Sequence, residues 1–191
     1  MSVTWQNFFE ETKNKPPRPL LIKALSFVKD RNTALDFGAG ALNDSMYLLS
    51  EEFKKVIALD RLSISAKQLD GIPAGRLEYI ISTFEDYKFP KNVYDLVNAQ
   101  YSLPFIYREA FDNVLAEIFT SLKIGGIFTG QLFGDRDEWK GNNRMVFHTR
   151  AQAEKLLSGM EVLQFVEEEQ DRLIAGDKTK HAHIYHFIVR K

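Results

Sequence analysis

The segment from Thr33 to Gly40 constrains the fold of this chain more than any other part of the sequence. A short apolar run, Thr33 to Phe37, leads directly into a turn that contains Gly38 and Gly40. A helix-like segment with apolar residues spaced by three and four follows at residues 44–52. A buried strand that passes through a glycine turn into a helix is typical of parallel α/β sheets.

The same alternation of short apolar runs and helix-like segments continues to the end of the chain. Short strands that alternate with helices form βαβ units, so the sequence predicts an α/β fold. We expect a Rossmann-like, doubly wound sheet that is mostly parallel and covered by helices on both faces. Ligands of such sheets bind beyond the carboxyl ends of the strands. Strands are expected at residues 33–37, 55–59, 77–81, 95–99, 127–132, 162–168 and 183–189, and helices at 20–29, 44–52, 63–69, 109–122 and 150–158.

Length and composition restrict the class of protein. The 191 residues favour one domain, 1–191, with a helical lead-in over 1–30 and a Rossmann-like core over 31–191. The net charge of −1 argues against a broad electrostatic contact with nucleic acid or an anionic membrane. The absence of cysteine excludes disulfides, thiolate nucleophiles and Cys-bound metals. No signal peptide or spanning segment is recognisable. We therefore expect a cytoplasmic monomer or homodimer that acts on a small molecule.

Asp36 indicates which ligand the glycine turn binds. Gly38, Ala39 and Gly40 allow close approach of a ligand, but dinucleotide-binding proteins also have such a turn. Their fingerprint needs a further glycine where this chain has Asn43. A carboxylate at the turn repels a pyrophosphate but attracts the ammonium and sulfonium of S-adenosylmethionine. The alternative is that Asp36 only hydrogen-bonds the turn.

Asp60 gives independent support for a nucleotide. It follows the second apolar strand, and 60 − 36 = 24 places it one βαβ step after Asp36. A carboxylate at this position can accept both ribose hydroxyls of an adenosine. The alternative is a loop carboxylate that caps the next helix. The two acids together favour an adenosyl cofactor with a positive charge.

The stretch from Ala34 to Ser45 resembles motif I of the class I S-adenosylmethionine-dependent methyltransferases. Its continuation over residues 43–48 is most similar to the tellurite-resistance-type and thiopurine-type branch, whose members act on small molecules. Asp60 and the stretches 89–97 and 122–126 extend the resemblance. It implies a seven-stranded sheet with an antiparallel last strand, S-adenosylmethionine as cofactor, S-adenosylhomocysteine as product and methyl transfer to a small-molecule acceptor.

Two positions depart from the family pattern. Leu42 stands where motif I often has its third glycine, and its side chain is expected to narrow the methionine pocket. Thr83 stands where an acid usually follows the third strand. Thr83 can still hydrogen-bond the adenine, and Phe84 can pack either on the adenine or in the core.

Polar residues after the fourth and fifth strands are candidates for the acceptor side. The resemblance places Gln100 and Tyr101 beside the transferable methyl group, although Tyr101 can also be a packed aromatic residue. His148 is a candidate for proton transfer, which methyl transfer needs only for some acceptors. Arg136 is a weaker candidate, for which a solvated charged loop is the favoured interpretation. Arg18 can reach the methionine carboxylate or remain solvated.

The histidines of the last strand, at positions 181, 183 and 186, do not predict a metal site, and residues 167–169 read as a solvated strand end. The expected catalytic residues are Gln100, Tyr101 and His148. The expected cofactor-binding residues are Arg18, Asp36, Gly38, Ala39, Gly40, Asp44, Asp60, Arg61, Thr83, Phe84 and Gln100.

Three functions are compatible with this pattern. The leading one is methyl transfer from S-adenosylmethionine to a small molecule. Because Leu42 and Thr83 depart from the family, a non-catalytic protein that binds S-adenosylmethionine or S-adenosylhomocysteine is the alternative. A nicotinamide-dependent oxidoreductase is disfavoured by Asp36 and Asn43.

Overall fold

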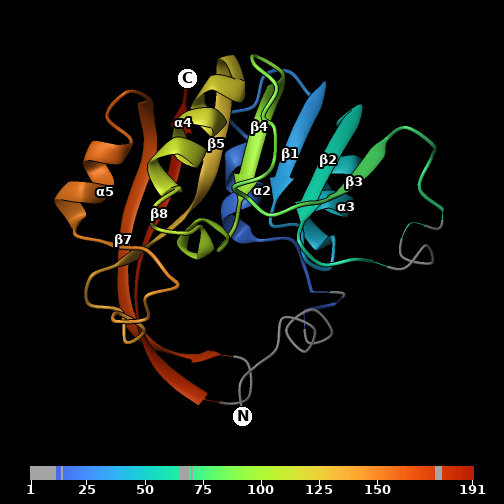
Figure 1. The fold of residues 1–191 in the computed structure, drawn as a ribbon. Helices are drawn as coiled ribbons and strands as arrows, with labels where there is room; N and C mark the ends of the chain where they lie inside the picture. Colours follow the sequence, from blue (N-terminus) through green and yellow to red (C-terminus); the bar gives the residue numbers. More distant parts are fainter. Residues whose placement is uncertain (1–11, 14, 65–68, 70, 175–177) are drawn as a thin grey trace.

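A computed structural model describes residues 12–13, 15–64, 69, 71–174 and 178–191. Within these residues, one eight-stranded sheet forms the centre of the molecule (Figure 1). Its strands are β1 (Thr33–Phe37), β2 (Lys55–Asp60), β3 (Leu77–Ile81), β4 (Tyr94–Ala99), β5 (Leu122–Gly134), β6 (Phe147–His148), β7 (Glu161–Ile174) and β8 (Lys178–Arg190).

The order of the strands confirms the expected fold class. The sheet runs β3-β2-β1-β4-β5-β8-β7, and the short strand β6 pairs with β5 outside this path. The first five strands pair in parallel, whereas β8 is antiparallel to both β5 and β7. Because the chain moves outward from β1 to β3 and then returns to β4, the carboxyl ends of β1 and β4 meet at a topological switch point.

Helices cover both faces of the sheet (Figure 1). Helices α2 (Pro19–Leu25) and α3 (Asn43–Ser50) bury their apolar side chains in one cluster. Helices α4 (Phe111–Ser121) and α5 (Arg150–Leu156) contribute to a second cluster on the opposite face. Burial of both faces explains why the inner strands read as continuous apolar runs in the sequence. No helix of the described residues has the length and apolar character needed to cross a membrane.

The second half of the chain differs most from the predicted elements. The first four strands agree with the sequence to within one residue, but β5 begins at Leu122, directly after α4. The glycines at 125 and 126, which follow the helix expected at 109–122, therefore lie inside β5, where Gly125 has a φ of 80°. The helix expected at 63–69 falls mainly on residues 65–68, outside the described residues.

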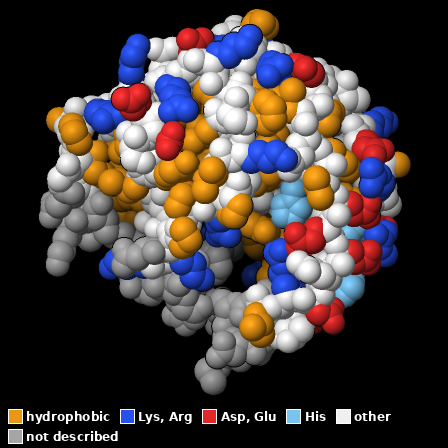
Figure 2. Space-filling model, turned by 180° about the vertical axis from the view of Figure 1, so that it is seen from behind, with side chains coloured by type: hydrophobic (Ala, Val, Ile, Leu, Met, Phe, Trp, Pro, Cys, Tyr) orange, Lys and Arg blue, Asp and Glu red, His pale blue; other side chains and the backbone are white. Residues whose placement is uncertain are grey.

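Strands β7 and β8 continue beyond the sheet as a two-stranded ribbon. β8 pairs with β5 only from Ile184 onward, so residues 178–183 have β7 as their sole partner strand among the described residues. Figure 2 shows that acidic, basic and histidine side chains gather over this part of the sheet.

Ion pairs on the ribbon correct two expectations from the sequence. The guanidinium of Arg136 lies 2.8 Å from carboxylate oxygens of both Glu167 and Glu169. It also lies 3.2 Å from Nε2 of the buried His183. These acids are therefore paired within a strand rather than solvated at its end. Arg136 lies in the loop after β5 with its side chain half exposed, but it pairs with these acids instead of standing free in solvent. Glu167, Glu169 and His183 have the spacing of a metal-ligand set, but the guanidinium already supplies the positive charge there.

A buried ion pair joins the ribbon to the loop that follows β5. The ammonium of Lys180 lies 2.7 Å from the carboxylate of Asp137, and the two side chains are 4% and 0% exposed. The ammonium also lies 3.6 Å from the centre of the Trp139 ring. Asp137 accepts two further hydrogen bonds, from the backbone N–H groups of Trp139 and His183. The loop after β5 and the ribbon therefore form one fixed wall.

Asp137→Asn should destabilise the protein strongly, because it leaves the buried Lys180 charge without its counterion. We expect the free energy of unfolding to fall by about 3–5 kcal/mol, measured by urea denaturation. Glu78→Gln is the matched control, since it breaks the exposed ion pair with Lys55 and should cost at most about 1 kcal/mol. Equal effects of the two substitutions would contradict the structural role of the buried pair.

Candidate functional site

Two buried carboxylates meet at the switch point between β1 and β4. Asp36, at the end of β1, accepts hydrogen bonds from Ser45 Oγ at 2.5 Å and from Asn98 Nδ2 at 2.9 Å. Asp44, in the first turn of α3, accepts from the same Asn98 amide at 3.2 Å and from the backbone N–H of Arg18 at 3.0 Å. Asn98 is fully buried and links the two acids from β4.

A chain of side-chain amides extends this cluster across the sheet. Asn98 Oδ1 accepts from Gln100 Nε2 at 2.9 Å, and Gln100 Oε1 accepts from Gln131 Nε2 at 2.8 Å. Gln131 Oε1 in turn accepts the backbone N–H of Tyr101 at 2.8 Å. The cluster thus connects β1, β4 and β5, and Gln100 is held from both sides.

The two acids are poised to receive a positive charge. Burial and, to a lesser extent, the nearby Asp44 carboxylate raise the pKa of Asp36 to about 7, against the opposing effect of the hydrogen bonds from Ser45 and Asn98. Burial also raises the pKa of Asp44, against the hydrogen bonds from Arg18 and Asn98. A cation placed between them would relieve their repulsion and favour the charged form of both.

The turn after β1 leaves open space beside these acids. Gly38 has a φ of 87°, and a Cβ there would lie 2.6 Å from Ser102 Cβ, so a larger residue does not fit. Gly40 has a φ of 48°, and a Cβ at this position would have no other atom within 4 Å. Asp60, at the end of β2, accepts the backbone N–H of Gly40 at 2.8 Å. The turn therefore lies directly between Asp36 and Asp60.

Leu42 does not narrow the site in the way the sequence suggested. It has a left-handed backbone with a φ of 66°, which explains why a glycine is common at this position of the motif. Its side chain is buried and packs with Ala39 and Ala58, between the turn and β2. The departure from the family pattern therefore strains the backbone instead of filling the space beside the acids.

The residues after β3 are engaged within the protein. Thr83 Oγ1 donates to the carboxylate of Asp86 at 2.8 Å and accepts the backbone N–H of Asp86 at 3.2 Å. Phe84 stacks on Phe37 with ring centroids 4.1 Å apart, and its edge lies over Gly38. Phe84 is thus a core aromatic that borders the turn, and the hydroxyl of Thr83 is already used for a local turn.

Tyr101 joins three separate parts of the chain. It has a φ of 58°, an uncommon conformation for a bulky residue, and such strain is often found at functional sites. The guanidinium of Arg18 lies 5.0 Å from its ring centre, and Arg172 of the ribbon donates to its hydroxyl at 3.2 Å. Tyr101 also packs with Phe133 in an apolar cluster beside the loop after β5.

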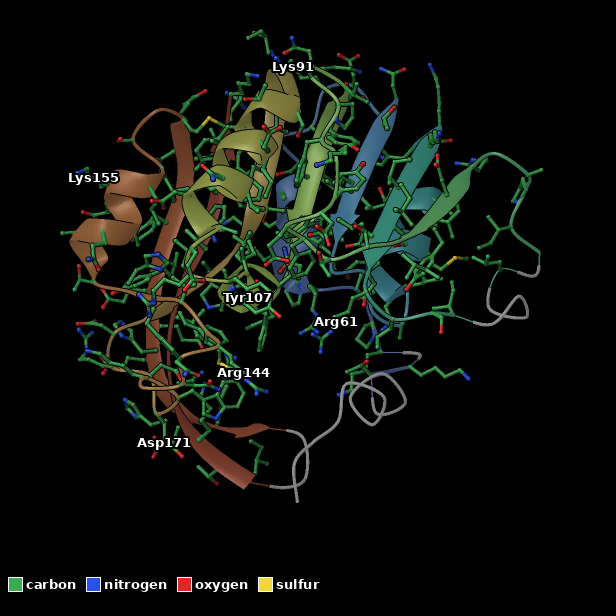
Figure 3. All side chains as sticks on the ribbon, in the orientation of Figure 1. Arg61, Lys91, Tyr107, Arg144, Lys155 and Asp171 are labelled. Atoms are coloured by element: carbon green, nitrogen blue, oxygen red, sulfur yellow. The ribbon has the colours of Figure 1, made fainter. Side chains whose placement is uncertain are left out.

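His148 stands apart from this network. Its ring packs on Phe111 of α4 with centroids 5.0 Å apart, and burial together with the charge of Arg108 lowers its pKa to about 4. The lowered pKa makes His148 a weak base, and no hydrogen bond among the described residues joins it to the network around Tyr101. Figure 3 places Arg61 near the carboxyl end of β2, on the same edge of the sheet as Tyr107 and opposite Lys91.

Several residues of the site did not stand out in the sequence. Asn98 and Gln131 are polar residues within strands that are otherwise apolar, which is the signal that could have identified them. Ser45 and Arg172 carry no such signal, because each is an ordinary polar residue in a helix or a ribbon. Ser102 Oγ is buried without a hydrogen-bond partner among the described residues, and it lies beside Gly38.

These features fit an adenosyl cofactor with a methionine group. The unpaired hydroxyl of Ser102 offers a hydrogen-bonding group, and the turn at Gly40 offers space. Asp36 and Asp44 offer a place for a positive charge on the same edge of the sheet. A pyrophosphate would instead meet the carboxylates of Asp36, Asp44 and Asp60.

Comparison with known proteins identifies the class. Residues 35–129 match the family model for a methyltransferase domain. They run from the middle of β1 through β4 to the middle of β5, and hence contain most of the site described above. The chain therefore contains a methyltransferase domain, and it is an enzyme of the Rossmann-like methyltransferase class.

Solved structures with a similar fold include methyltransferases. One is the 1,6-didemethyltoxoflavin-N1-methyltransferase of Burkholderia thailandensis, crystallised with S-adenosylhomocysteine. It is 20% identical with a TM-score of 0.69, over 91% of this chain and 77% of that one. TehB of Haemophilus influenzae is 13% identical with a TM-score of 0.73, over 98% and 67%. An S-adenosylmethionine-dependent methyltransferase of Methanosarcina mazei is 17% identical with a TM-score of 0.67, over 93% and 99%. A search of curated protein sequences found no significant match.

Substitutions at position 42 should show the left-handed backbone directly. Leu42→Ala and Leu42→Gly both remove a buried side chain, at a cost of about 2–5 kcal/mol. We expect the glycine variant to be more stable than the alanine variant by roughly 1 kcal/mol, since glycine adopts a positive φ without strain. Urea denaturation measures the difference. At Leu48, a buried position inside α3, the order should reverse, and the same order at both positions would contradict the strain at Leu42.

Asp36→Asn should change how stability depends on pH. Because folding raises the pKa of Asp36 from 3.8 to about 7, its contribution to stability is full below pH 4 and is lost as the pH rises through 7. Asparagine can keep both hydrogen bonds, since Ser45 can act as acceptor. We expect the variant to match the wild type near pH 4 and to exceed it at pH 8 by an amount of the order of 3 kcal/mol. A constant difference between pH 4 and pH 8 in urea denaturation would overturn this assignment.

Proposed function

We propose that the protein transfers the methyl group of S-adenosylmethionine to a small-molecule acceptor and releases S-adenosylhomocysteine. The observation that carries this proposal is the buried cluster of Asp36, Asp44 and Asn98 at the switch point, with Asp60 at the end of the next strand. The methyltransferase domain and the cofactor product bound in a structural neighbour support it.

Each part of the cofactor has a chemically suited partner in the proposed site. The carboxylates of Asp36 and Asp44 suit the ammonium of the methionine group, and Arg18 suits its carboxylate. Asp60 suits the ribose hydroxyls, for which it would exchange its present hydrogen bond with Gly40. Arg61, Thr83 and Phe84 follow the ends of β2 and β3 and are proposed to border the adenosine.

S-adenosylmethionine, when bound, supplies an activated methyl group, so the protein has to align the acceptor and exclude water. Gln100 is fixed between Asn98 and Gln131 and can hold one side of the reaction space rigid. Arg172 donates to Tyr101, which leaves the hydroxyl proton of Tyr101 available for an acceptor. We assign these two residues to orientation and leave His148 outside the catalytic set.

We further propose that one domain, residues 1–191, carries this activity in the cytoplasm, as a monomer or homodimer and without a nucleic-acid or membrane partner. The near-neutral net charge supports this proposal. So does the packing of both apolar clusters against a single sheet.

Calorimetric titration with S-adenosylhomocysteine tests the cofactor site. Asp60→Ala should weaken binding by at least about tenfold, since it removes hydrogen bonds to a charged group. Asp30→Ala makes the same change of charge on an exposed residue that precedes β1, at the opposite edge of the sheet, and should leave the affinity unchanged. The proposal fails if the folded wild type does not bind at millimolar concentration.

Turnover separates an enzyme from a binding protein. S-adenosylhomocysteine should accumulate from S-adenosylmethionine with at least one acceptor in a panel of small molecules that offers oxygen, nitrogen, sulfur and metalloid nucleophiles. Tight binding of the cofactor without turnover across such a panel would instead support the non-catalytic alternative.

A further inference from the structure

An open surface cavity of about 690 Å³, lined mainly by polar residues, lies between the segment before α4, the loop after β5 and the start of α5. Its size is within the usual range of small-molecule sites. Phe147 forms part of its wall and packs on Phe133 with ring centroids 6.1 Å apart. Phe133 and Phe147 belong to the same apolar cluster as Tyr101, so the cavity and the proposed methyl-transfer point border one set of packed side chains.

The wall of the cavity offers hydrogen-bond donors because local turns already use its acceptors. Asn142 Oδ1 accepts the backbone N–H of Arg144 at 3.1 Å. Thr149 and Gln152 form the capping box of α5. Thr149 Oγ1 accepts the backbone N–H of Gln152 at 3.3 Å, and Gln152 Oε1 accepts the backbone N–H of Thr149 at 2.8 Å. The amide N–H groups of Asn142 and Gln152 and the hydroxyl proton of Thr149 therefore remain to be donated.

The charge of the wall is also positive. Arg108 and Lys140 both line the cavity. Neighbouring basic residues such as Arg136, Arg150 and Lys180 pair with carboxylates, but no ion pair among the described residues involves Arg108 or Lys140. Asp135 is the one acid of the wall, and it lies 3.9 Å from Nη1 of Arg136 and 3.8 Å from Nδ1 of His183.

We propose that this cavity is the acceptor subsite and that it binds an anionic small molecule, with a carboxylate or phosphate on a planar ring. The two cations and the free donors match an oxygen-rich anion. The ring of Phe147 matches a planar partner. This inference rests on the proposed function, because that function makes the neighbouring Tyr101 the point of methyl transfer.

Nuclear magnetic resonance with ¹⁵N-labelled full-length protein tests the subsite, using benzoate, phenyl phosphate and neutral benzamide as probes. We expect at least one of the two anions to shift the side-chain amide signals of Asn142 and Gln152 with saturation, and benzamide to have little effect. Arg108→Gln and Lys140→Gln should each weaken anion binding by about fivefold or more. Lys155→Gln is the matched control, because Lys155 is exposed on α5 and does not line the cavity (Figure 3).

The outcomes separate this inference from the proposed function. Equal shifts with benzamide, anion binding that survives both substitutions, or no shifts with either anion would overturn it. Comparison of the two anions shows whether a carboxylate or a phosphate is preferred. Calorimetry with S-adenosylhomocysteine is read on the same samples. A protein that binds the cofactor but not the anions refutes the subsite alone, and one that binds the anions but not the cofactor refutes the proposed function.

Discussion

The buried contact between Asp36 and Asn98 is the interaction on which the site depends. It joins the carboxyl ends of two neighbouring parallel strands, and the same amide also reaches Asp44 at the start of α3. A buried carboxylate is costly unless hydrogen bonds satisfy it, so β1, β4 and α3 are held in one arrangement. Burial and the neighbouring Asp44 carboxylate nevertheless raise the pKa of Asp36, so its charged form keeps a free-energy cost. The remaining cost is what a cationic ligand can relieve.

The proposed cofactor side and the proposed acceptor side of the molecule are built from different kinds of structure. The cofactor side consists of parallel strands that end in short turns, and the family match covers most of it. The acceptor side consists of the loop after β5, the ribbon of β7 and β8 and the buried pair of Asp137 and Lys180. Tyr101 touches both sides, through Arg18 and through Arg172. The two proposed sides thus meet at one strained residue.

Much of the cofactor side could be predicted from the sequence because it follows from local patterns. Apolar runs that end in Asp36 and Asp60 identify both the strands and the acids that follow them. The amide chain through Gln131 could not be predicted, because it depends on β5 lying next to β4 in the sheet. The left-handed backbone of Leu42 could not be predicted either, because leucine rarely adopts a positive φ. The same limit applies to Arg136, whose partners lie more than thirty residues away in the sequence.

The place of β8 in the sheet has a consequence for how the chain folds. β8 is the last strand of the described chain, but it lies between β5 and β7. During synthesis, β1 to β5 can therefore pair before β8 has left the ribosome, while β7 has no neighbouring strand to join. Until then the edge of β5 stays open, and an open strand edge is a template for association with other chains. Closing the sheet requires contacts between residues more than fifty positions apart, which slows folding. Chaperone protection of this edge is therefore most valuable between the synthesis of β5 and that of β8.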